Sequence, residues 1–382
     1  MHDFTVTPYA VEGDVDYDRL LDQFGADRLT DEQIANFPQP AHHLVRRGVF
    51  YAGRDVDRFT AAAGRGDTVS IVTGVGPSGP MHLGHAYHFY HAKYLQDQTG
   101  AHVYIPLSDD EKRFSKSLTF DEIHEYAREN VRDLLAVGFD PERTRIVVDT
   151  ADADVVYPLA AEFATDLTPA TVEAVYGPPP NVGLGFYPAV QATHLLLPQL
   201  VHGPHPTLVP IAVDQDPHVR VCRDLAAKQR YDVQKPAALL SKFLPQLGGG
   251  GGKMSSSDAA PSILLTDDRE TVREKVLEHA YSGGRSDVEA HRKHGGDPEV
   301  DVAYQLLFYF FETDDAELER LAAEYRSGEL LSGELKLHAA DRIADFLEAH
   351  QERRPDGPVS DVVEPYRLTD EERRRLFSGV FG

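Results

Sequence analysis

Two histidines and a glycine at 82–85 form a pattern that suits nucleotide binding. His82 and His85 lie three residues apart in the segment HLGH, so both imidazoles can face one side of a helix start. Gly84 lets a nucleotide approach the backbone closely. Taken alone, the two histidines can also be helix caps or surface residues, so this pattern is a moderate signal for nucleotide binding.

A second pattern, KMSSS at 253–257, follows five consecutive glycines. Lys253 provides a compact cation that can reach a pyrophosphate, while Ser255 and Ser256, which follow Met254, provide hydroxyl and backbone N–H groups. A lysine and serines after a glycine run are, taken alone, typical of a solvated linker. The two patterns together favour an ATP site, because both contain groups that bind phosphate.

The chemistry that these groups favour is attack by a carboxylate on the α-phosphorus of ATP. A carboxylate is already ionised at pH 7, so this attack needs no general base. The protein has to orient the reactants and to stabilise the negative charge that spreads over the α-phosphate and the departing pyrophosphate. Histidines, a lysine and backbone N–H groups suit that task.

The residues around 82–85 predict a strand, a loop and a helix. The segment TVSIVTGV at 68–75 is short, β-branched and bounded by glycine, which predicts a buried strand. The loop GPSGP follows, shaped by Pro77 and Ser78, and apolar residues then recur at helical spacing from Met81. Phosphate groups bind at junctions of this kind.

Alternating strands and helices predict the fold of this region. Strands are expected at 102–107 and 144–149 with a helix from Phe120 between them, and a strand at 207–213 precedes the polar loop DQDP and a further helix. This order predicts an α/β fold with a Rossmann-like, doubly wound parallel sheet. The ligands of such sheets bind at the carboxyl ends of the strands.

The periodicity changes after residue 262. Apolar residues then recur only at helical spacing, near 269–280, 301–313, 315–327 and 332–351. We therefore expect an N-terminal extension at 1–66, a Rossmann-like catalytic domain at 67–267 and an all-helical domain at 268–382.

Cysteine content and hydropathy argue against a disulfide-bonded, zinc-binding or membrane protein. The single cysteine, Cys222, excludes an intrachain disulfide and a zinc site built from several thiolates. The histidines are expected to face solvent or to lie in loops, and no metal site is expected. No apolar run approaches the roughly 20 residues that cross a bilayer, and the first residues lack a basic leader, so we expect a cytoplasmic protein without membrane contact.

The charge is strongly acidic, with 62 Asp and Glu against 38 Lys and Arg and a net charge of -24. An ordinary solvated surface would account for such a charge. Adaptation to high salt is favoured, because the Debye length falls to about 3 Å at 1 M salt and self-repulsion is then screened. A polyanionic RNA would have to bind a local basic patch on this acidic body.

The two motifs resemble the HIGH and KMSKS signatures of class I aminoacyl-tRNA synthetases. Longer segments, among them VDYDRLLDQFG, HLVRRGVFYAGRD, LSDDEKRF, IAVDQDPHVRVCRD and SGELLSGELK, resemble the archaeal and eukaryotic tryptophanyl-tRNA synthetases. This resemblance implies a Rossmann catalytic domain, an anticodon-binding helical domain and a homodimer. It also implies ATP with Mg²⁺, tryptophan and tRNA(Trp) as ligands, and tRNA charging as the function.

The resemblance also implies roles for individual residues. Ala212, Asp214 and Gln215 match the segment that holds the ATP ribose and the amino acid, and Asp214 can accept hydrogen bonds from both ribose hydroxyls. Glu111 and Gln191 match residues that face the substrate ammonium and carboxylate. Purely structural roles are also open to these two, since Glu111 can belong to a helix cap and Gln191 can be a satisfied interior amide.

The chain departs from the family pattern at two positions that bind the substrate indole. The family has a tyrosine and a glutamine there to bind the indole N–H, and this chain has Val72 and Pro106. Neither side chain forms hydrogen bonds. A missing partner for a buried donor costs about 1–3 kcal/mol, so another group must meet the indole N–H or the pocket prefers another substrate.

Three alternatives to tryptophan activation remain at this point. Val72 and Pro106 are compatible with a diverged paralogue of shifted specificity, tyrosine being the obvious substrate. A noncatalytic tRNA-binding protein on the same scaffold is disfavoured by the intact HLGH and KMSSS. A small-molecule nucleotidyltransferase is disfavoured by KMSSS and by the helical C-terminal region.

Overall fold

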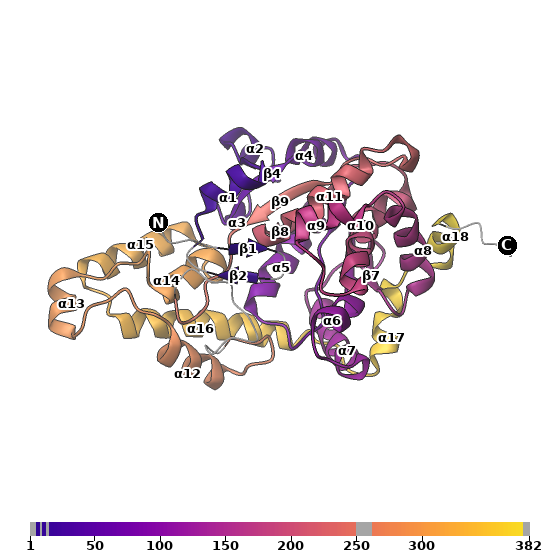
Figure 1. Ribbon diagram of the computed structural model, residues 1–382. Coiled ribbons are helices and arrows are strands. Elements are labelled where there is room, and N and C mark those ends of the chain that lie inside the picture. The colour runs from indigo at the N-terminus through magenta and orange to yellow at the C-terminus, as the bar shows by residue number, and fades with distance from the viewer. Residues whose placement is uncertain (1–4, 8–9, 13–14, 250–261, 377–382) are drawn as a thin grey trace.

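The centre of the molecule is a seven-stranded sheet with the strand order β3-β4-β9-β8-β5-β6-β7 (Figure 1). The computed structural model describes residues 5–7, 10–12, 15–249 and 262–376. The strands from β9 to β7 run parallel, which confirms the expected α/β, doubly wound fold. The strands are β3 (Asp27–Arg28), β4 (Phe50–Arg54), β5 (Ser70–Val72), β6 (His102–Leu107), β7 (Thr144–Val148), β8 (Thr207–Ala212) and β9 (Ala237–Ser241).

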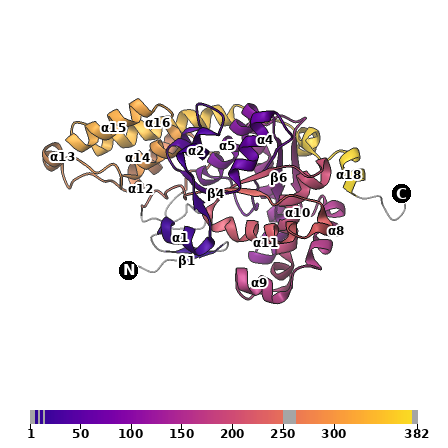
Figure 2. The same ribbon diagram turned by 90° about the horizontal axis from the view of Figure 1, so that it is seen from above.

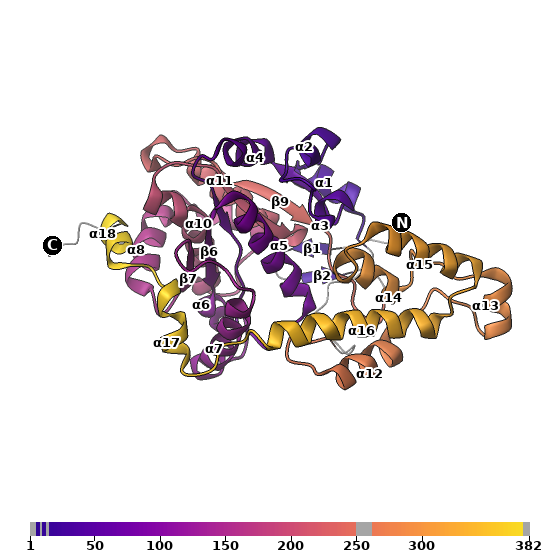
Figure 3. The same cartoon turned by 180° about the vertical axis from the view of Figure 1, so that it is seen from behind.

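Helices cover both faces of the sheet, because the side chains of each strand alternate between two cores. Ile71 and Ile105 pack in one core, while their neighbours Val72 and Tyr104 pack in the other. Figure 3 shows the first face with α5 in front of the strands. The first face is covered by α4 (Val56–Arg65), α5 (Leu83–Thr99) and α7 (Phe120–Ala136), and the second by α8 (Ala153–Ala164), α10 (Val182–His202) and α11 (Asp216–Ala226).

Shorter elements join these layers. They are α6 (Asp109–Ser115) after β6, α9 (Pro169–Tyr176) before α10, and the 3-10 turns η1 (Val213–Gln215) after β8 and η2 (Gln229–Tyr231) before β9. Among the described residues, no helix is both long and apolar enough to span a membrane.

Part of the segment expected to be an N-terminal extension belongs to the sheet. β4 pairs antiparallel with β9, and β3 pairs antiparallel with β4. Phe50 and Ala52 of β4 are fully buried, so this strand belongs to the hydrophobic core of the sheet. The other N-terminal elements are the hairpin of β1 (Thr5–Thr7) and β2 (Ala10–Glu12), and the helices α1 (Tyr17–Phe24), α2 (Asp31–Ala35) and α3 (His43–Arg46).

The C-terminal region is helical, as expected, and extends to one side of the sheet (Figure 2). It has a small core of its own, and it also shares the core on the α5 face of the sheet. Its helices are α12 (Arg269–His279), α13 (Val288–His294), α14 (Val302–Leu306) continued by the π-helical turn η3 (Leu307–Phe311), α15 (Asp315–Ser327) and α16 (Ser332–Gln351).

After α16 the chain returns to the far side of the sheet in α17 (Val359–Val363), η4 (Glu364–Tyr366) and α18 (Asp370–Leu376). An ion pair between Glu372 and Arg145 of β7, 2.8 Å long and largely buried, fixes this last segment. The described end of the chain therefore packs on the α/β body and not on the helical region.

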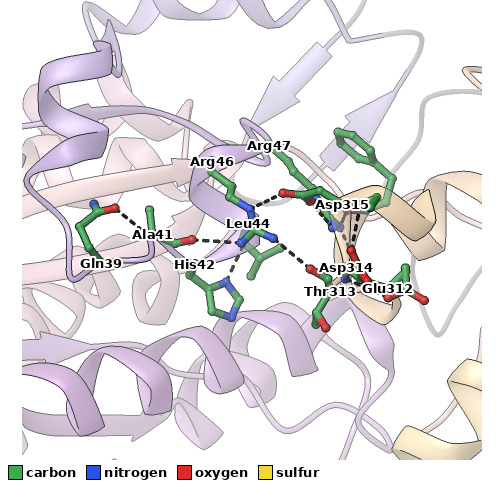
Figure 4. A network of polar contacts seen from close by, with 12 residues as sticks. Gln39, Ala41, His42, Leu44, Arg46, Arg47, Glu312, Thr313, Asp314 and Asp315 are labelled. Atoms are coloured by element: carbon green, nitrogen blue, oxygen red, sulfur yellow. Dashed lines mark hydrogen bonds and ion pairs between the residues drawn. The ribbon is translucent and has the colours of Figure 1, made fainter. Parts of the chain in front are cut away.

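Two neighbouring arginines, Arg46 and Arg47, bind the helical region to the body (Figure 4). Arg46 Nε donates to Asp315 Oδ2 at 2.7 Å, and Arg47 Nε donates to Asp315 Oδ1 at 2.8 Å. Arg47 also donates to the carbonyl oxygens of Phe308 and Glu312. The hydrogen bond from Arg46 is the largest of the effects that lower the pKa of Asp315 to about 2.

Candidate active site

The HLGH segment forms the start of α5, the helix that follows β5. His82 is the N-cap, and its Nδ1 accepts from Gly84 N at 3.1 Å, while His85 Nδ1 accepts from His82 N at 3.3 Å. The two rings lie 4.0 Å apart. The histidines are thus helix caps, and their predicted role in nucleotide binding stays a prediction. Since Nδ1 accepts in each ring, the neutral tautomer has its proton on Nε2, where it can donate to a phosphate oxygen.

The glycines of the loop between β5 and α5 are required by close contacts. A Cβ on Gly74 would lie 2.5 Å from the carbonyl oxygen of Pro106, and a Cβ on Gly76 would lie 2.0 Å from Lys112 Cε. Lys112 therefore lies against the loop, where it also forms a 2.6 Å ion pair with Glu111. Pro77 is buried and Ser78 is partly exposed in the same loop.

The residues that follow the second motif pair with the start of α5. Leu83 N donates to Ile263 O at 3.1 Å, and Leu265 N donates to Met81 O at 2.9 Å. Residues 262–265 therefore form an antiparallel strap along 81–83, with His82 opposite Leu264. Lys253, Met254, Ser255 and Ser256 lie outside the described residues, so their predicted roles stay predictions.

The inner end of α16 contacts this strap. The Gln351 amide donates to the carbonyl oxygens of Leu265 and Asp267, each at 2.9 Å. Asp267 in turn accepts from Leu264 N at 2.8 Å and forms a 2.6 Å ion pair with Lys275 of α12. The helical region thus fixes residues 265–267, which follow the strap, through Gln351 and Lys275.

The AVDQ segment follows β8, the sheet neighbour of β5. Asp214 is 1% exposed, and its Oδ2 accepts from the amide of Gln215 at 3.0 Å. Ala212 is the last residue of β8 and is partly exposed. The next helix is held by Arg54, which forms two hydrogen bonds of 2.8 and 2.9 Å with the buried Asp216. The segment is therefore fixed by β8 before it and by α11 after it.

Glu111 lies in α6 and Gln191 in α10, two helices that contact each other, and Tyr187 joins Gln191 to Ser108, the residue before α6. Glu111 follows β6 and is 7% exposed, and Gln191 lies on α10. The Tyr187 hydroxyl donates to Gln191 Oε1 at 2.7 Å and lies 2.8 Å from Ser108 Oγ. Gln191 is partly exposed, so a fully interior amide does not describe it.

Val72 and Pro106 are both buried, Val72 in the core on the α10 face. The ring of Pro106 contacts Gly74, with Cγ 2.6 Å from where a Cβ would lie. Most of the described residues that the sequence predicts for the site follow β5, β6 and β8, three neighbouring strands, whereas Gln191 lies on α10 and Val72 and Pro106 lie within strands. Tyr187, Lys112 and Arg54 were missed, since isolated polar residues carry no motif; only their contacts identify them.

Three buried aspartates next to Glu111 are the one group in the described ranges arranged to offer a cation three ligands. Asp109, Asp110 and Asp149 have carboxylate oxygens within 4.8 Å of one another. Burial, and then the charge of Asp149, raises the pKa of Asp110 to about 8, and burial raises the pKa of Asp149. Asp110 therefore holds a proton at neutral pH, so the trio carries less negative charge than three ionised aspartates and suits a cation less well.

A histidine completes this acidic cluster. His194 of α10 is 2% exposed, and its Nε2 lies 2.6 Å from Asp149 Oδ1. The expectation that the histidines face solvent or lie in loops is therefore wrong for this residue. Burial lowers the pKa of His194 to about 4, so the ring is neutral and serves as a hydrogen-bond partner.

Sequence comparison places this geometry in a known family. Residues 65–348 match the family described as tRNA synthetases class I (W and Y). A Halobacterium salinarum protein named Tryptophan--tRNA ligase 2 is 65% identical, over 98% of this chain and 97% of its own. A Saccharolobus solfataricus protein named Tryptophan--tRNA ligase is 41% identical, over 99% of each chain.

Solved structures give the same result. The tryptophanyl-tRNA synthetase from Giardia lamblia superimposes with a TM-score of 0.84 at 34% identity and covers 93% of this chain and 96% of its own. A tryptophanyl-tRNA synthetase from Encephalitozoon cuniculi bound to tryptophan has a TM-score of 0.84 at 32% identity, covering 96% and 100%. Fold, motifs and matches together show that the chain belongs to the class I tRNA synthetases of the W and Y group.

Proposed function

We propose that this protein activates tryptophan with ATP, giving tryptophanyl-adenylate and pyrophosphate. It then transfers the tryptophanyl group to the 2′-hydroxyl of the terminal adenosine of tRNA(Trp), as a step of translation in the cytoplasm. The single observation that carries the proposal is 65% identity, over nearly the whole chain, to a protein named Tryptophan--tRNA ligase 2.

The described residues are suited to the first step. The Nε2–H groups of His82 and His85 donate to phosphate oxygens, and Glu111 attracts the substrate ammonium while Gln191 binds near its carboxylate. Asp214 accepts from the ribose hydroxyls, and Gln215 orients it through their hydrogen bond. Pro77, Ser78, Gly84 and Ala212 line the nucleotide. The groups that bind its pyrophosphate are Lys253, Met254, Ser255 and Ser256.

Magnesium accompanies ATP in this proposal as a partner of its phosphate oxygens. The acidic trio of Asp109, Asp110 and Asp149 does not fit as its holder, because the raised pKa values of Asp110 and Asp149 favour a proton there. No step is therefore assigned to a protein-held metal. Tryptophan supplies the attacking carboxylate, which is ionised at neutral pH.

We further propose that residues 268–382 bind the anticodon of tRNA(Trp) and that two copies of the chain form a homodimer. The helical region stands to one side of the α/β body, which places a surface away from the ATP site (Figure 2). Sedimentation in molar potassium chloride tests the dimer, and a monomeric mass at micromolar concentration would refute it.

The test of the substrate is ATP/pyrophosphate exchange in molar potassium chloride with each of the standard amino acids. We expect exchange with tryptophan at a kcat/KM far above that with tyrosine or phenylalanine. Preference for any other amino acid would refute tryptophan as the substrate. Exchange with no amino acid would refute adenylation altogether.

Lys253→Ala tests the second motif. Removing one preorganised cation from the pyrophosphate should slow adenylate formation about a hundredfold, measured in a single turnover. Lys293→Ala removes an exposed lysine of α13 and should leave the rate unchanged. A rate for Lys253→Ala equal to that of the control variant would exclude a role in activation.

A further inference from the structure

The buried hydroxyl of Tyr187, in the candidate site, can accept one more hydrogen bond than the protein provides. Tyr187 is 4% exposed, and its hydroxyl lies between Gln191 Oε1 at 2.7 Å and Ser108 Oγ at 2.8 Å. The Tyr187 hydroxyl has one hydrogen, which it donates to Gln191 Oε1 or to Ser108 Oγ. After the contact with Ser108, one lone pair on Tyr187 Oη is still available to accept from a donor.

This hydroxyl belongs to the same side of the sheet as the two changed positions. Tyr187 and Val72 pack in one core, on the face that α10 covers. Ser108 comes two residues after Pro106 along the chain. Burial, and then the charge of Glu111, raises the pKa of Tyr187, which places the phenol close to the carboxylate proposed to bind the ammonium of the substrate.

Two further buried or half-buried tyrosines on this face are oriented elsewhere. The Tyr104 hydroxyl lies 3.0 Å from His202 Nε2, at the end of α10 remote from Gln191. The Tyr157 hydroxyl donates to Asp110 within the acidic cluster. Tyr187 is thus the phenol, of these three described tyrosines, whose hydroxyl contacts both Gln191 and Ser108, the latter three residues before Glu111.

We propose that the Tyr187 hydroxyl, held by Ser108 and Gln191, accepts the hydrogen bond of the substrate's indole N–H. The indole has a single donor, and burying it without an acceptor would weaken binding. Val72 and Pro106 provide no side-chain acceptor, so the acceptor comes from the helix α10 instead of from β5 and β6. This inference rests on the proposed function, in which the substrate is tryptophan.

The experiment compares tryptophan with 3-benzothienylalanine, in which sulfur replaces the N–H and the shape is nearly kept. For the wild type, kcat/KM in the exchange reaction should be tenfold to a hundredfold higher with tryptophan. In Tyr187→Phe this ratio should fall toward one. Tryptophan loses the hydroxyl that accepts from its N–H, whereas 3-benzothienylalanine has no N–H and never used that hydroxyl. Tyr366→Phe in η4 is the control, since it removes a hydroxyl that donates to Phe139 O, and it should keep the wild-type ratio.

The ratio separates recognition from support of the fold. A loss that is equal for both substrates would show that Tyr187 only positions Gln191, and it would overturn the proposal; so would an unchanged ratio. Ser108→Ala, which keeps the phenol, should lower the ratio partially. An active wild type with an unaltered ratio in Tyr187→Phe refutes this inference alone, whereas a wild type without tryptophan-dependent exchange refutes the proposed function as well.

Discussion

At the scale of single residues, the unusual feature is a pair of carboxyls that share a proton beside the substrate site. Asp110 and Asp149 are both buried, and burial is the largest cause of the raised pKa of each. A proton on Asp110 removes one negative charge next to Glu111. In the proposed function, the ammonium of the amino acid is then attracted to Glu111 and not to a diffuse acidic cluster.

Asp110→Asn tests this shared proton through the pH dependence of stability. The folded pKa of about 8 lies above the ordinary aspartate value of 3.8, so the contribution of this group to stability is complete below pH 4 and is lost as the pH rises to 8, where the folded carboxyl ionises. The wild-type free energy of unfolding, relative to that of Asp110→Asn, should fall by up to about 1.4 kcal/mol per pH unit in this window. Urea unfolding at fixed salt measures it, and a flat difference from pH 4 to 8 would contradict a raised pKa.

At the scale of elements, the strap at 262–265 pairs with the residues that begin the first motif. Its backbone hydrogen bonds to 81–83 fix the start of α5, and Asp267 fixes the strap through Leu264 N and Lys275. Backbone pairing of this kind does not depend on side-chain type. It orders the histidine caps by holding the residues that precede and follow them.

Asp267→Ala should loosen this strap. We expect a loss of about 1–3 kcal/mol in the free energy of unfolding, since a backbone donor and a lysine lose their partner. The KM for ATP should rise several-fold, because His82 lies opposite the strap. Asp361→Ala, at an exposed aspartate of α17, is the matched control in urea unfolding and exchange kinetics. Equal values for both variants would show that the strap does not depend on Asp267.

The sequence predicted those elements whose periodicity is strong. The strand at 144–149, the helix from Phe120 and the helix at 315–327 are found as β7, α7 and α15. β9 was missed, because the short segment AALLS has weak β propensity and is a strand only through pairing with β4 and β8. The motifs predicted the nucleotide side of the site, whereas Tyr187 is identified by tertiary contacts that no local pattern encodes.

At the scale of the whole molecule, the net charge of -24 affects every surface contact. The 65% identical relative comes from Halobacterium, which fits adaptation of this composition to high salt. Many ion pairs at the surface are exposed, such as Arg269 with Asp345, and contribute little individually. Like-charge repulsion is then the electrostatic effect that salt should change most.

Lowering the salt should therefore destabilise the protein. Between 2 M and 0.1 M potassium chloride, the Debye length rises to about 10 Å and exposed acidic groups repel over longer distances. We expect the melting temperature, followed by circular dichroism, to fall by about 10 °C or more, a shift of a few kcal/mol for a chain of this size. Glycine betaine at equal osmolality, which screens no charge, should not restore it. A melting temperature independent of salt would refute the adaptation.

Through the contact of Gln351 with Leu265 and Asp267, the long helix α16 connects the outer helices to the strap. A helix of 20 residues is a rod about 30 Å long, with one end among the outer helices and the other on the strap. In the proposed function, tRNA binds the outer helices and ATP binds next to the strap, so a tilt of α16 would move the carbonyl groups that Gln351 contacts. Binding at the two ends would then be coupled reciprocally: ATP would alter the affinity for RNA by the same factor by which RNA alters the affinity for ATP.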